Sequence, residues 1–166
     1  MLQRPLRLEP RGPLAGALLL VATVALQALA FFDSRSPASL AAFAAIVPVM
    51  AYASSRSPAR AALGGALAGA ASLGLSCFWL AAYHRVAIVV GMTLGAFWFT
   101  LAFAAIAIVM NRGARIGPVA AAFLWSAAEW GRSYGFIAFP YSTLPYSQAD
   151  RALSYALASF GGATLV

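Results

Sequence analysis

The sequence has very little charge and no lysine. Charged residues make up 9% of its 166 residues, and all eleven basic residues are arginine. A soluble domain usually carries about 25% charged residues, so a water-soluble surface is excluded. The arginines stand singly or in pairs between apolar runs and form no basic stripe, which argues against nucleic acid as a partner. We therefore expect a protein whose solvent is lipid.

Cysteine and histidine are nearly absent. Cys77 is the single cysteine, so no intrachain disulfide can form, and a lone cysteine in an apolar run is typically a small packing residue. His84 has no carboxylate or second histidine at ligand spacing. No nucleotide-binding loop or Ser/His/Asp arrangement stands out either. We expect no metal and no cofactor.

Long apolar segments are what the sequence does contain. It is 63% hydrophobic, and a membrane-spanning helix needs about 20 mostly apolar residues. The first segment exceeds the usual apolar core of a signal peptide, about 7–15 residues, so we expect it to stay uncleaved. We expect an all-α membrane protein, a polytopic bundle of five transmembrane helices plus the start of a sixth, in one domain over 1–166. The spans are predicted at 13–32, 37–54, 59–83, 87–110 and 117–131, and the sixth at 152–166.

The distribution of arginine predicts an orientation. Short loops rich in arginine stay on the cytoplasmic side. If the N-terminus is cytoplasmic, seven arginines lie on that side and four on the other. We therefore expect a multi-pass protein of a bacterial inner membrane with its N-terminus in the cytoplasm and a periplasmic loop over 131–151.

Glycine pairs predict close helix packing. Gly65 with Gly69, and Gly91 with Gly95, form two GxxxG patterns, which let helix backbones approach in lipid. The alternative is that glycine and alanine are simply frequent in this chain.

Polar residues gather in one late window, EWGRSYGFIAFPYSTLPYSQ, over 129–148. Glu129 and Arg132 are three residues apart and can pair on one helical face. The pair either ends the helix and holds the loop, or anchors a lipid headgroup or a following domain. Pro140 and Pro145 prevent a continuous helix. We expect an ordered, partly re-entrant loop packed by a cluster of aromatic residues, namely Tyr134, Phe136, Phe139, Tyr141 and Tyr146.

A second group of candidates lies where the segment 59–83 ends. Trp79 and His84 belong either to an ordinary interfacial turn, where aromatic and basic groups are common, or to the lining of a lipid-facing site.

The late window resembles a stretch of bacterial apolipoprotein N-acyltransferases, E-W-L-R-x-W-x-F-T-G-F-P-W-x-x-L-G-Y-S-Q. FWLAAYHRV, over 78–86, is similar to that family's W-x-x-x-S-x-H segment. The chain departs from the pattern at several positions, including Gly131 for leucine and Pro145 for glycine. Ten residues match in order and spacing: Glu129, Trp130, Arg132, Phe136, Phe139, Pro140, Leu144, Tyr146, Ser147 and Gln148.

The resemblance implies an enzyme that passes an acyl chain from a phospholipid, through an enzyme thioester, to the N-terminal cysteine α-amine of bacterial lipoproteins. Its Glu–Lys–Cys triad belongs to a nitrilase-like domain. This chain has no lysine, so we expect it to be the membrane portion, inactive alone, with no catalytic residue. The implied partners are a phospholipid acyl donor, a diacylglyceryl lipoprotein and the bilayer. The structural or substrate-lining candidates are Glu129, Trp130, Arg132, Phe139, Pro140, Tyr146, Gln148, Trp79 and His84.

Two rival interpretations remain open. The chain could be the membrane domain that accompanies a polyprenol-phosphate mannosyltransferase, or a small transporter or scaffold. The coding sequence that follows residue 166 would discriminate between them.

Overall fold

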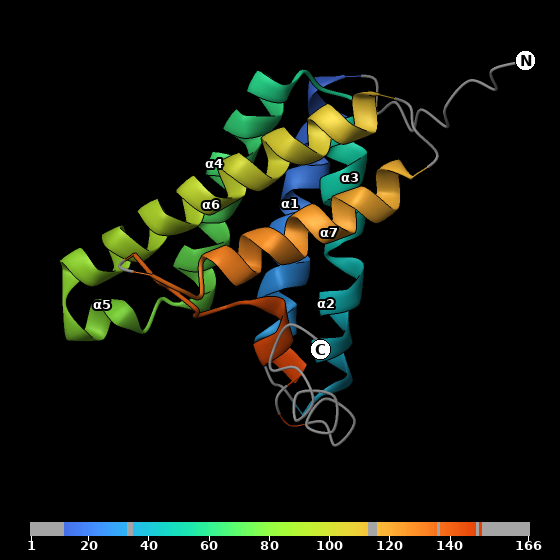
Figure 1. Ribbon diagram of the computed structural model, residues 1–166. Helices are drawn as coiled ribbons and strands as arrows, with labels where there is room; N and C mark the ends of the chain where they lie inside the picture. Colours follow the sequence, from blue (N-terminus) through green and yellow to red (C-terminus); the bar gives the residue numbers. More distant parts are fainter. Residues whose placement is uncertain (1–11, 33–34, 113–115, 136, 149, 151–166) are drawn as a thin grey trace, which may run out of the picture.

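The computed structural model describes residues 12–32, 35–112, 116–135, 137–148 and 150, and every regular element in these ranges is helical (Figure 1). The all-α fold class is therefore confirmed. The predicted start of a sixth span, at 152–166, lies outside the described residues. The elements are α1 (Pro13–Ala30), η1 (Pro37–Leu40), α2 (Ala41–Ala44), α3 (Ile46–Ser54), α4 (Pro58–Ser76), α5 (Leu80–Tyr83), α6 (Arg85–Asn111), α7 (Gly117–Gly131) and η2 (Leu144–Gln148).

Three helical segments of the described chain are long and apolar enough to cross a membrane. They are Pro13–Ala30, Pro37–Ser54 and Arg85–Asn111. Helix α4 has 19 residues but contains many glycines and alanines, and α7 has only 15 residues. The chain is thus built as a membrane protein, while a total of five spans stays a prediction.

Two of the predicted spans are interrupted. In 37–54, a 3₁₀ turn and α2 precede α3, and the helix breaks at Ala45. Pro48 explains this break, because proline lacks the N–H that would bond to the carbonyl of Ala44 and its ring crowds that carbonyl. In 59–83, α4 ends at Ser76 and the short α5 begins at Leu80. No proline or glycine marks this second break.

The two GxxxG patterns meet at the contact between α4 and α6. A Cβ added to Gly69 would overlap the carbonyl oxygen of Gly95, and one added to Gly95 would lie 2.7 Å from the carbonyl oxygen of Gly69. Gly65 faces the backbone of Phe99 in the same way. The predicted close helix packing is confirmed for these three glycines, whereas Gly91 faces Leu80 and Phe139 instead.

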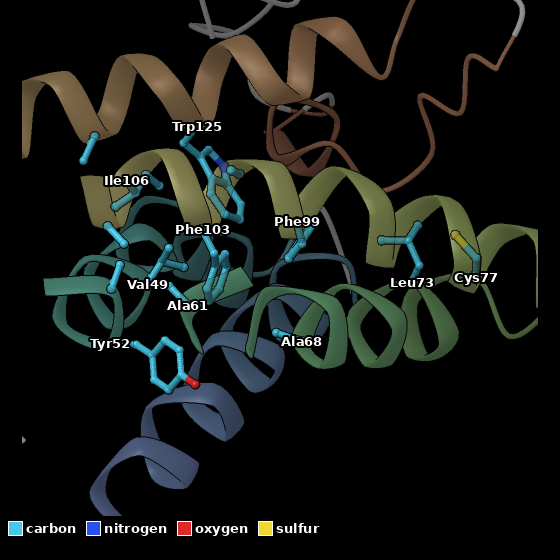
Figure 2. Packing of buried hydrophobic residues seen from close by; sticks show 14 residues of the cluster. Val49, Tyr52, Ala61, Ala68, Leu73, Cys77, Phe99, Phe103, Ile106 and Trp125 are labelled. Atoms are coloured by element: carbon cyan, nitrogen blue, oxygen red, sulfur yellow. The ribbon is translucent and has the colours of Figure 1, made fainter. Parts of the chain in front are cut away.

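The buried core is centred on α6. Phe99, Phe103 and Ile106 of α6 pack between α3, α4 and α7, and Trp125 reaches down to them from α7 (Figure 2). The outward faces carry large exposed apolar side chains, such as Leu18 of α1 and Leu67 of α4. An exposed apolar surface of this kind suits a lipid environment.

Successive elements run between two ends of the bundle. The start of α1, the turn between α3 and α4 and the end of α6 lie toward the top of Figure 1, and α5 and η2 lie toward the bottom. At the top, Arg56 donates to the carbonyl of Gly12 (3.1 Å) and Asn111 donates to the carbonyl of Arg56 (2.8 Å). The late polar window therefore lies at the end opposite to the start of α1. Which end faces the periplasm stays a prediction.

Candidate functional site

A buried ion pair stands at the C-terminal end of α7. Glu129 is in the last turn of the helix and Arg132 follows it, with Glu129 Oε1 and Arg132 Nη2 3.6 Å apart. The two side chains are only 12% and 3% exposed, respectively. The pairing predicted from their spacing is confirmed. A buried charge needs such a partner, because leaving water is costly for either group alone.

The ion pair also holds the chain that follows α7. Glu129 Oε1 accepts a hydrogen bond from the Leu144 amide at 3.1 Å, and Arg132 Nη2 donates to the Ser142 carbonyl. The carbonyl of Arg132 accepts from the Phe139 amide at 2.7 Å. Hydrogen bonds to charged groups are stronger than neutral ones. The described part of the window is thus an ordered loop fixed by the pair, as the sequence predicts.

Ser142 is the residue on which these contacts converge. Its φ of 59° is left-handed, a conformation that non-glycine residues adopt rarely. In this conformation its carbonyl meets Arg132, and its hydroxyl lies 3.3 Å from the Cys77 thiol at the end of α4. Nothing in the residue pattern predicts that Ser142 and Cys77 join the loop to α4.

The aromatic residues of the window form two groups rather than the one expected cluster. Phe139 packs on Tyr141, and Tyr141 meets Trp79 edge to face. On the other side, Trp130 packs against Tyr134. The division follows from the fold, because the first group covers α5 and Gly91 of α6, whereas the second joins Trp130 of α7 to Tyr134 just after the helix. Phe136 lies outside the described residues.

A cavity of about 460 Å³ opens between α2, α3, α7 and η2. This volume is within the usual range for small-molecule pockets, about 300–1,000 Å³. Apolar groups make up most of the lining, and the carboxyl group of Glu129 and the side chain of Gln148 supply polar groups. The lining residues are Ala42, Phe43, Ile46, Ala122, Trp125, Ser126, Glu129, Trp130, Ser133, Tyr134, Pro140, Thr143, Leu144, Pro145, Tyr146 and Gln148.

Gln148 closes one side of this cavity. It is 2% exposed, and its Nε2 donates to the carbonyl of Ser39 at 2.7 Å and to the Ser147 hydroxyl at 2.9 Å. Because the Ser39 carbonyl can only accept, the orientation of the amide is fixed. Residues 109 positions apart are thereby joined, and η2 is held against η1.

The nine candidate residues occupy four places. Those lining the cavity are Glu129, Trp130, Pro140, Tyr146 and Gln148. Arg132 is buried behind Glu129, while Phe139 and Trp79 belong to the aromatic group next to α5. His84 is exposed, and its Nδ1 accepts from the Val86 amide at 3.1 Å as the cap of α6. Their functional roles stay predictions.

The residues that form the opposite wall of the cavity were not among the candidates predicted from the sequence. Phe43 and Ile46 come from α2 and α3, about 80 residues before the window. Their only signal is apolar character, which they share with most of the chain. The lining holds no cysteine, histidine or lysine among the described residues.

The fold and the cavity define a helical membrane protein with a mainly apolar pocket at one end of its bundle. The family model for the apolipoprotein N-acyltransferase N-terminal domain matches residues 15–166, and the chain therefore belongs to this family. Comparisons with curated proteins and with solved structures found no match.

Proposed function

We propose that this chain is the membrane portion of an enzyme that transfers an acyl chain from a phospholipid to the N-terminal cysteine α-amine of bacterial lipoproteins. Membership of the N-acyltransferase family supports the reaction class. The protein would be a multi-pass protein of the inner membrane, with a cytoplasmic N-terminus and a periplasmic loop over 131–151. Its partners would be the phospholipid donor, the diacylglyceryl lipoprotein and the bilayer.

The observation that carries this proposal is the cavity formed by the family-like window. The pocket is mainly apolar, lies in a lipid-adapted bundle and has a carboxyl group at its wall. Such a pocket suits an acyl chain, because a bound chain would be largely shielded from water by the apolar walls. The ion pair of Glu129 and Arg132 supports the same proposal, because it fixes the loop that forms one wall.

The catalytic residues would lie in a domain outside these 166 residues. The resemblance implies a Glu–Lys–Cys triad, and this chain contains no lysine. Cys77 is buried at the end of α4 against Ser142, so it is not placed to act as the nucleophile. Acyl transfer through a thioester requires an accessible, activated thiolate.

The test compares the complete gene product with residues 1–166 alone. Each protein is reconstituted in vesicles with a phospholipid that carries a labelled acyl chain and with a diacylated lipopeptide that has a free N-terminal cysteine amine. We expect the complete protein to add one labelled acyl chain to the peptide, detected by mass spectrometry, and residues 1–166 to add none.

The outcome that contradicts the proposal is a complete gene product that transfers no acyl chain. A glycosyltransferase domain after residue 166 would favour the mannosyltransferase-associated module instead. A stop codon after residue 166 would favour a transporter or scaffold.

A further inference from the structure

Two buried N–H groups next to the ion pair lack a hydrogen-bond acceptor among the residues that the structure describes. They are Trp98 Nε1 on α6 and Arg132 Nε, whereas the indole of Trp125 on α7 lies against the Glu129 carboxylate. Arg132 is 2% exposed and Trp125 is 5% exposed. A buried donor without a partner is costly, and nearly all such groups in folded proteins find one.

Trp98, Trp125 and Arg132 line the same small cavity, which adjoins the larger pocket and shares Trp125 and Glu129 with it. Its volume is about 10 Å³, and Glu129 is the one acidic residue in its wall. The remaining wall is apolar and consists of Phe99, Ala102 and Ala128. Two residues with unpaired N–H groups and one acidic residue therefore line a space at the junction of α6, α7 and the loop.

The size and the polarity of this space restrict what can bind there. A volume of this order holds about one water molecule and nothing larger. A cation is disfavoured because Arg132 and two indole groups line the space and bring N–H donors rather than additional acceptors. An anion is not required, because Arg132 is already paired with Glu129. Water accepts two hydrogen bonds and donates two, so it matches a set of donors beside a carboxylate.

We propose that one water molecule is bound in this cavity, where it accepts from Trp98 Nε1 and Arg132 Nε and donates to the Glu129 carboxylate. The water completes the hydrogen bonds of Arg132, whose Nη2 already donates to the Ser142 carbonyl. It thereby joins α6, at the centre of the bundle, to the charged pair that fixes the loop.

Gly131 leaves room for the Trp98 indole. A Cβ at residue 131 would lie 3.0 Å from two atoms of the indole ring, which is tighter than ordinary packing allows. The edge of the ring that carries these two atoms thus lies against Gly131. Trp98 acts as a positioning residue for Arg132, through the water.

The direct test is an experimental map of the full chain at a resolution that shows ordered water. We expect a density peak within hydrogen-bond distance of both Trp98 Nε1 and Arg132 Nε, and loss of this peak in Trp98→Phe, which removes the N–H and keeps a ring. Trp130→Phe is the matched control, because Trp130 is 55% exposed and does not line the cavity, and the peak should remain.

A second measurement covers the case in which Trp98→Phe does not fold. In the wild-type chain, with ¹⁵N in tryptophan and arginine, the N–H signals of Trp98 Nε1 and Arg132 Nε should both show magnetisation transfer from one bound water. Either an empty cavity in the wild-type map or a protein acceptor on these N–H groups overturns the proposal. Signals without transfer from water overturn it as well.

Discussion

At the scale of single residues, Glu129 and Arg132 depend on each other. Removing one partner of a buried ion pair leaves an uncompensated charge, which destabilises a protein by about 3–5 kcal/mol. We expect Glu129→Ala to lower the free energy of unfolding by this order, because Arg132 is 3% exposed at its side chain and cannot reach water easily. Unfolding by a denaturing detergent in mixed micelles measures the change.

The double variant Glu129→Ala with Arg132→Ala supplies the control. It removes both charges, so it should be destabilised by less than the sum of the two single variants. Strictly additive losses would show that the two side chains do not interact.

Gly131 gives a second prediction at this scale, because the resemblance places leucine at this position. In this chain the space next to residue 131 is filled by Trp98. Gly131→Leu should therefore overpack the site and lower the free energy of unfolding by about 1–3 kcal/mol. The same unfolding measurement should show a partial recovery when Trp98→Ala is added. A Gly131→Leu chain as stable as the wild type would mean that Trp98 does not occupy this space.

At the scale of elements, the close contact between α4 and α6 depends on glycines, which have no side chain to separate the two backbones. Gly69→Ala should destabilise the bundle by about 1–3 kcal/mol, because the new methyl group would meet the Gly95 carbonyl, which cannot move without separating the helices. Gly74→Ala is the control on the same helix, since its Cβ would meet only Met92 side-chain atoms at 3.5 Å. Equal losses in the two variants would argue against the glycine contact.

The loop and the end of α4 are a second pair of elements whose contact can be tested. The Cys77 thiol and the Ser142 hydroxyl are 3.3 Å apart, so Ser142→Cys should form a disulfide with Cys77 on mild oxidation. Mass spectrometry of the peptides detects the bond. Ser133→Cys is the control, because the Ser133 hydroxyl donates to the Glu129 carbonyl on α7 instead. Equal crosslinking of both variants, or none with Ser142→Cys, would contradict the docking of the loop.

At the scale of the whole molecule, the arginine distribution predicts which end of the bundle faces the cytoplasm. In a Cys77→Ser background, Tyr141→Cys should react with a membrane-impermeant maleimide in spheroplasts, in which the outer membrane is removed and the inner membrane is intact. Arg112→Cys, at the other end, should react only after the inner membrane is opened. Both residues are exposed, so their access to the maleimide differs only by the side of the membrane on which they lie. The reverse labelling pattern would overturn the predicted orientation.

The sequence by itself determined that the protein is adapted to lipid and that its local elements are helices. Scarce charge and long apolar runs required a lipid-adapted helical bundle, and the boundaries of α6 and α7 lie within two residues of the predicted spans. The pairing of Glu129 with Arg132 was also legible, because residues three apart on a helix are neighbours whatever the rest of the chain does.

Only the tertiary structure decided how distant segments meet. No proline or glycine lies between Ser76 and Leu80 to predict the break between α4 and α5. The cavity wall formed by Phe43 and Ile46 has the same apolar sequence character as most of the chain. The contact of Gln148 with Ser39 joins residues 109 positions apart. Such contacts depend on the relative placement of packed helices, which the periodicity of a single segment does not encode. For this reason the polar window could be recognised from its residues, while the pocket it forms became visible only in the folded chain.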